Sequence, residues 1–105
     1  MPSDDPPADD GPLETWLVHI TGRVQGVGFR HACVQEARAL DVTGWVRNRH
    51  DGSVEAMLQG GAQRLAQLCD RLREDVPAAD VEQLRITGLA PPFARFDTFE
   101  QRPTD

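Results

Sequence analysis

Hydrophobic and polar residues alternate along several stretches of this chain, and each of these stretches predicts a β-strand. The first covers residues 16–21, the second residues 42–48, and a third begins at Val54. Residues 81–88 predict a fourth strand, and a short last strand at a sheet edge is expected over residues 96–101. The chain therefore predicts a β-rich fold with two interruptions of a different kind.

These interruptions carry apolar residues at the spacing of amphipathic helices. The first runs from about residue 29 to residue 40, with every third or fourth residue apolar. The second has its apolar spacing from Leu65 to Val76, and Pro77 is expected to end it. The adjacent glycines Gly60 and Gly61 are expected to break the strand before this helix.

The resulting order is βαββαβ with one small extra strand. This order is typical of an α+β, ferredoxin-like sandwich, with two helices packed on one face of an antiparallel sheet of four to five strands. The two cysteines, Cys33 and Cys69, fall on the apolar helix faces. We expect them to be small buried hydrophobic residues, not part of a disulfide framework or a zinc site.

The composition divides the chain into a tail and one domain. The 105 residues carry a net charge of −6, and the 11 basic residues are all Arg. Residues 1–12 combine Pro, Asp and Gly and hold −4 of that charge, which leaves −2 for the rest. We expect residues 1–12 to be a disordered acidic tail and residues 13–102 to form one compact domain.

These properties argue against several classes of function. No apolar run approaches the roughly 18 residues of a membrane span, and no secretory signal is visible at the N-terminus. A nearly neutral domain with an acidic tail is a poor match for a nucleic-acid backbone. We therefore expect a cytoplasmic monomer with no membrane partner and no nucleic-acid partner.

The segment that most suggests chemistry is the glycine-rich run GRVQGVGFR, residues 22–30, between the first strand and the first helix. Glycines permit backbone conformations in which successive N–H groups converge on an anion. The helix adds free N–H groups and the positive end of its dipole, with no Ser, Thr, Asp or Asn before it as a cap. An anion site and a tight structural turn both fit this pattern.

Arg30 begins that helix, and its planar guanidinium is suited to gripping two phosphate oxygens. The loop is not a Walker A element, because no Gly-Lys-Ser/Thr follows, and His31 stands where a dinucleotide-binding pattern needs glycine. Asn48 ends the second strand, where its side chain can either stabilise a turn or orient a water molecule. Arg23 fits either a phosphate contact or a solvated side chain.

Two motifs resemble those of the acylphosphatase family. Residues 22–30 match its signature G-R-V-Q-G-V-x-F-R at every position. Residues 44–54, GWVRNRHDGSV, with Gly60 beyond them, match its second motif. The resemblance covers residues 13–102 and implies the same ferredoxin-like fold.

The resemblance implies a hydrolase that splits acyl phosphates into a carboxylate and inorganic phosphate without a metal or other cofactor. The family's phosphate-binding arginine corresponds to Arg30, and its water-orienting asparagine corresponds to Asn48. The backbone that binds the phosphate corresponds to Val24, Gln25, Gly26, Val27, Gly28 and Phe29. His31 and His50 are expected to be surface histidines.

Three other functions share parts of this pattern. One is the acylphosphatase-like domain of the carbamoyl-transfer proteins of hydrogenase maturation, which are hundreds of residues longer. Another is an RNA-binding domain of the same topology, for which Trp16 and Trp45 are the only aromatic candidates. The third is a regulatory domain that binds phosphate without turnover, which would not need Asn48. The substrate stays open among acetyl phosphate, carbamoyl phosphate, 1,3-bisphosphoglycerate and aspartyl phosphates.

Overall fold

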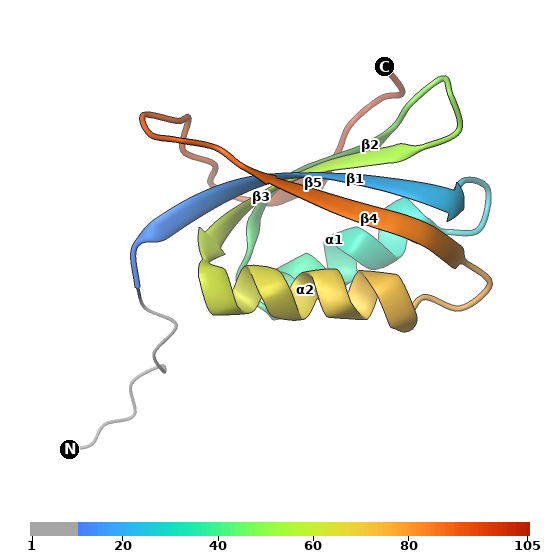
Figure 1. Ribbon diagram of the computed structural model, residues 1–105, viewed down its shortest axis with the longest axis horizontal. Coiled ribbons are helices and arrows are strands. Elements are labelled where there is room, and N and C mark those ends of the chain that lie inside the picture. The colour runs from blue at the N-terminus through green and yellow to red at the C-terminus, as the bar shows by residue number, and fades with distance from the viewer. Residues whose placement is uncertain (1–10) are drawn as a thin grey trace.

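The computed structural model describes residues 11–105 as one five-stranded sheet with both helices on the same face (Figure 1). Along the chain the elements are β1 (Leu13–Arg23), α1 (Phe29–Ala39), β2 (Thr43–Asn48), β3 (Val54–Gly61), α2 (Ala62–Glu74), β4 (Asp80–Gly88) and β5 (Phe99–Gln101). The predicted ferredoxin-like α+β arrangement is confirmed. Of the predicted tail, residues 1–10 lie outside the described residues.

The strands lie in the order β4-β1-β3-β2-β5, so β4 and β5 are the two edges. β1 pairs antiparallel with β3 and β4, and β2 pairs antiparallel with β3. β5 differs from the expected antiparallel sheet, because it runs parallel to β2 and pairs Phe99 with Gly44. The reason is the path of residues 89–98, which cross the sheet from the end of β4 to the start of β2. β5 therefore begins beside the start of β2 and runs in the same direction.

The ends of two elements also differ from the sequence-based expectation. Gly60 and Gly61 do not break β3, because they continue its ladder and pair with Glu14 and Leu13 of β1. A Cβ at Gly60 would meet the Leu65 side chain at an ordinary contact distance, so the packing there does not require glycine. α2 ends at Glu74, so Val76 joins the core from the loop beyond the helix.

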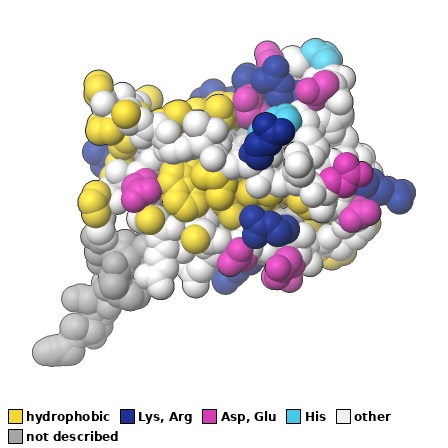
Figure 2. Space-filling view, viewed as in Figure 1, with side chains coloured by type: hydrophobic (Ala, Val, Ile, Leu, Met, Phe, Trp, Pro, Cys, Tyr) yellow, Lys and Arg dark blue, Asp and Glu magenta, His cyan; other side chains and the backbone are white. Residues whose placement is uncertain are grey.

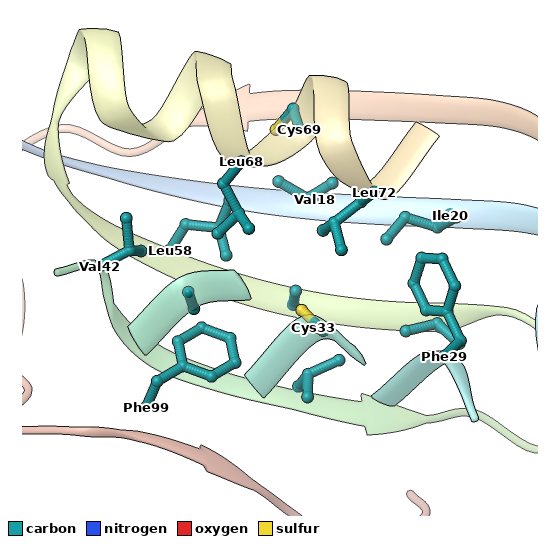
Figure 3. Close-up of a cluster of buried hydrophobic side chains, with 14 of the residues drawn as sticks. Val18, Ile20, Phe29, Cys33, Val42, Leu58, Leu68, Cys69, Leu72 and Phe99 are labelled. Atoms are coloured by element: carbon teal, nitrogen blue, oxygen red, sulfur yellow. The ribbon is translucent and has the colours of Figure 1, made fainter. Parts of the chain in front are cut away.

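The hydrophobic core fills the space between the helices and the sheet (Figure 3). Its members come from every layer of the fold and include Val18, Ile20, Phe29, Cys33, Val42, Leu58, Leu68, Cys69, Leu72 and Phe99. Burial of each large apolar side chain contributes about 1.5–3 kcal/mol relative to exposure. The helical periodicities that predicted α1 and α2 therefore mark the faces that form this core.

Both cysteines are buried free thiols, as expected from their helix faces. Burial raises the pKa of the Cys69 thiol to about 11. Burial also raises the pKa of the Cys33 thiol well above its ordinary value, and the nearby Cys69 adds to that rise. Both groups are protonated at neutral pH, and they serve as small hydrophobic residues.

The surface over β4 and α2 is partly apolar. Figure 2 shows hydrophobic side chains gathered in the middle of this face, with charged side chains around them. Ile86 of the edge strand β4 is 44% exposed, although its neighbours on the same sheet face pack into the core. Within residues 11–105, neither helix is long and apolar enough to cross a membrane.

Gly22 and Gly44 let neighbouring strands approach one another closely. Both have positive φ values, 119° and 134°. A Cβ on Gly22 would overlap the carbonyl oxygen of Asp80, and a Cβ on Gly44 would overlap that of Met57. The first glycine lies at the irregularity where β1 leads into the glycine-rich loop, and the second lies in the strand that ends at Asn48.

Substitution of Gly44 by alanine is expected to lower the free energy of unfolding by at least about 3 kcal/mol, because backbone strain adds to a clash with a neighbouring strand. Gly88→Ala is the matched control, since nothing lies within 4 Å of its Cβ position. We expect that control to stay within about 0.5 kcal/mol of the parent in urea denaturation. Equal stability of the two variants would contradict the close-approach account.

Candidate active site

A pocket of about 140 Å³ lies where the β1–α1 loop meets the end of β2. It is lined by Val24, Gly26, Gly28, Phe29, Arg30, His31, Asn48 and Gln101. The fold therefore brings Arg30 and Asn48, which come from separate sequence motifs, to the same pocket. Their meeting follows from the central position of β1 and β3, because β2 is attached to β3 beside the loop that leaves β1.

The loop that lines this pocket has backbone N–H groups without acceptors of their own within residues 11–105. Gly26 and Gly28 have φ values of 76° and 80°, and Gly28 is the N-cap of α1. No side chain caps this helix end, and the first intrahelical bond runs from the Ala32 N–H to the Gly28 carbonyl at 3.0 Å. The N–H groups of residues 26–31 donate to no acceptor within residues 11–105. Such a turn, at the positive end of a helix dipole, is suited to an anion.

Glycine is needed in this loop for conformation, not for space. Nothing lies within 4 Å of the Cβ position of Gly26 or Gly28. Their positive φ values are nevertheless unfavourable for any residue with a Cβ. The loop thus combines an open surface with a backbone shape that only glycine adopts easily.

The other predicted loop residues divide into anchors and pocket residues. Val24 and Phe29 are each 1% exposed, so their side chains anchor both ends of the loop in the core. Val27 packs against the same core from a partly buried position. Gln25 and Val27 do not line the pocket. Five of the seven residues predicted to bind phosphate therefore line the pocket.

Gln25 has a role that the sequence analysis missed. Its Nε2 donates hydrogen bonds to the carbonyl oxygens of Arg49 and Ser53, both at 2.8 Å. These carbonyls lie on either side of the β2–β3 turn, so one side chain ties the glycine-rich loop to the hairpin that begins after Asn48. The only sequence signal was an amide side chain with two N–H donors in an otherwise apolar and glycine-rich loop.

The turn itself is stabilised by Asp51. Its Oδ1 accepts hydrogen bonds from the Ser53 hydroxyl at 2.6 Å and from the Ser53 N–H at 2.9 Å. These bonds hold the pKa of the Asp51 carboxyl below its usual value, with a smaller contribution from the positive charge of Arg49. The two carbonyl groups that accept hydrogen bonds from Gln25 therefore belong to a turn that is itself held by hydrogen bonds.

Arg30 provides positive charge to the pocket. Its guanidinium has no hydrogen-bond or ion-pair partner within residues 11–105, and none of the pocket residues is acidic. By contrast, Arg47 and Arg49 are both engaged by the Glu55 carboxylate, at 2.7 and 3.3 Å. Arg30 is thus available to an anion that enters the pocket.

The remaining predicted residues lie at different distances from this pocket. His31 is exposed and lines its rim, whereas His50 lies exposed in the β2–β3 turn and does not line it. Arg23, at the end of β1, is exposed and also stays outside the lining. Gln101 lines the pocket and was missed, because its position depends on the parallel pairing of β5 with β2.

The described residues offer no cluster of metal ligands. Among residues 11–105, no group of three or more His, Cys, Asp or Glu side chains is arranged to hold a metal ion. The residues that line the pocket include Arg30, the glycine-rich loop and Asn48, which carry a guanidinium, backbone N–H groups and an amide. These are donors, and they match the oxygens of a phosphate.

Comparison with known proteins identifies the family. The acylphosphatase family model matches residues 16–100. The chain is 57% identical over 97 residues to acylphosphatase 1 of Ralstonia nicotianae, covering 92% of this chain and 95% of that protein. It is 53% identical over 94 residues to an acylphosphatase of Polaromonas naphthalenivorans, with coverages of 90% and 93%. The crystal structure of acylphosphatase from Bacillus subtilis matches with a TM-score of 0.81 and 30% identity, covering 87% of this chain and 99% of that chain.

The matched residues include both sequence motifs and run from within β1 to within β5. The chain belongs to the acylphosphatase family. The predicted family and enzyme class are therefore confirmed.

The Gln25 contact can be tested by Gln25→Glu, which keeps the shape of the side chain and removes its N–H donors. The new carboxylate would face two carbonyl oxygens, so we expect the free energy of unfolding to fall by about 2 kcal/mol. Gln35→Glu, the same change on the exposed face of α1, is the control. Both are measured by urea denaturation at neutral pH, and a similar small effect in the two variants would argue against the contact.

Proposed function

We propose that this chain hydrolyses acyl phosphates to a carboxylate and inorganic phosphate, with the pocket between the β1–α1 loop and Asn48 as its active site. One observation carries the proposal: Arg30, whose guanidinium has no partner within residues 11–105, the uncapped start of α1 and Asn48 all line one small pocket. Family membership supplies the reaction, and the donors in the pocket fit its substrate.

Binding of the phosphoryl group is assigned to Arg30 and to the backbone of Val24–Phe29. The guanidinium can form two parallel hydrogen bonds to phosphate oxygens, and the free N–H groups can meet the remaining oxygen charge. Phosphoryl transfer requires mainly positioning and stabilisation of charge on the equatorial oxygens. Fixed donors meet this need without reorganising during the reaction.

Asn48 is assigned to the attacking water, because its side chain offers one acceptor and two donors. The water oxygen forms a bond to phosphorus while the bond from phosphorus to the acyl oxygen breaks. The carboxylate leaves with that electron pair, and a phosphate oxygen of the substrate takes the proton from the water. A carboxylate is a good leaving group, so the reaction needs no strong general acid.

The proposal also includes the expected setting of the enzyme: cytoplasmic, monomeric, independent of metal and without a nucleic-acid partner. The sheet surface supports the last point, because Trp45 is only 7% exposed. The guanidinium carbons of Arg47 and Arg102 lie 4.8 and 5.0 Å from its ring centroid. Its ring is therefore occupied by cation–π contacts and is poorly placed to stack with bases.

Hydrolysis of benzoyl phosphate in the presence of EDTA tests the proposal directly. We expect metal-independent turnover, with kcat/KM lowered on the order of 10²–10³-fold by Arg30→Ala because a preorganised donor is lost. Asn48→Ala should lower kcat while the inhibition constant of inorganic phosphate stays nearly unchanged. Arg73→Ala, which removes an exposed arginine paired with Asp70 on α2, is the charge-matched control and should behave like the parent.

Two results would contradict different parts of the proposal. Binding of phosphate without turnover would leave a phosphate-binding domain in place of an enzyme. Activity that disappears with EDTA and returns with a divalent cation would contradict independence from metal. Circular dichroism and urea denaturation of each variant separate loss of activity from loss of the fold.

A further inference from the structure

Residues 101–105, which we call the arm, continue from β5 along β2 towards the pocket. Figure 1 shows the end of the chain beside the β2–β3 hairpin. The Arg102 N–H donates to the Val46 carbonyl at 2.8 Å, and the Asp105 N–H donates to the Asn48 carbonyl at 3.1 Å. The arm begins at Gln101, which itself lines the pocket. It therefore connects one wall of the pocket to the backbone of the residue assigned to the water.

The Asp105 bond is the last connection between the arm and β2. Parallel pairing of β5 ends with Gln101 opposite Val46. Pro103 follows and has no backbone N–H to donate. Beyond Arg102, the Asp105 N–H is thus the backbone donor that holds the arm against the end of β2.

The Asp105 side chain contacts the residues on both sides of Asn48. Its Oδ2 lies 3.8 Å from an Arg47 nitrogen and 3.5 Å from an Arg49 nitrogen. The same two arginines are engaged by Glu55 from β3. Asp105 is 47% exposed, so these ion pairs contribute little to stability on their own. Together with the backbone bond, however, they place one residue of the arm against the last two residues of β2 and the residue that follows them.

We propose that Asp105 is a positioning residue for Asn48. Its N–H fixes the Asn48 carbonyl, and with it the direction in which the Asn48 side chain leaves the strand. A small shift of that side chain would move the bound water out of line with phosphorus without changing the phosphate-binding loop. This inference rests on the proposed function of Asn48, and it assigns to the arm a part in the reaction.

Two substitutions separate the backbone bond from the side-chain contacts. Asp105→Ala keeps the N–H and removes the carboxylate, whereas Asp105→Pro removes both. Thr104→Pro is the matched control, because it introduces the same ring where the N–H donates to no acceptor within residues 11–105. The difference between Asp105→Pro and Asp105→Ala then measures the contribution of the bond to Asn48.

We expect Asp105→Pro to lower kcat about tenfold, because a misplaced reactant loses its alignment. KM and the inhibition constant of phosphate should change less than about twofold, since the phosphate site is untouched. Asp105→Ala and Thr104→Pro should keep kcat within about twofold of the parent. The first removes only exposed ion pairs, and the second removes an N–H group that has no acceptor within residues 11–105. In an Asn48→Ala background, Asp105→Pro should cause no further loss of kcat, because both changes act on the same residue.

A second measurement keeps the inference independent of activity. In ¹⁵N NMR spectra, the side-chain amide signals of Asn48 should move in Asp105→Pro and stay in place in Thr104→Pro. If the parent protein lacks turnover, the proposed function fails, and these signals alone decide whether the arm positions Asn48. The inference is overturned by unmoved Asn48 signals, by unchanged kcat in Asp105→Pro, or by an equal loss of kcat in Thr104→Pro.

Discussion

The two hydrogen bonds from Gln25 join the glycine-rich loop to the β2–β3 turn, beyond the point where the pairing of β1 with β3 ends. One part is a loop fixed by the core at Val24 and Phe29, and the other is a hairpin that projects from the sheet. The sheet sets the position of Asn48 through its pairing with Val54, and the Gln25 bonds add a direct link between the loop that carries Arg30 and the turn that follows Asn48. The geometry of the pocket therefore depends on an amide side chain that does not itself line it.

The charges around the sheet are distributed in a way that favours this pocket. Arg47 and Arg49, on either side of Asn48, are paired with Glu55, and Arg71 of α2 is paired with Glu36 of α1. Arg30 is different, because it borders a pocket without acidic residues. A positive charge without a partner among residues 11–105 is available to interact with an incoming anion.

Periodicity in the sequence predicted most of the fold, because each helix and each central strand buries one regular face. The motifs also indicated Arg30 and Asn48, since a glycine-rich turn before a helix and a strand-end amide have recognisable chemistry. The direction of β5 was not predictable, because it depends on the path of residues 89–98 across the end of the sheet. The hydrogen bonds of Gln25 to the turn and the place of Gln101 in the pocket were missed for a related reason, because both depend on residues far away in sequence.

The two edges of the sheet oppose the addition of further strands by different means. β4 is long enough to pair with another chain, but Asp80, Glu82 and Arg85 place exposed charges along it. β5 is only three residues long, and Pro103 follows it without an N–H group. Charges on an edge and a proline beside a short strand both discourage sheet-to-sheet association. The same arm that reaches the pocket thus also closes the open side of the sheet, so that growth of the sheet beyond one molecule is resisted at both borders.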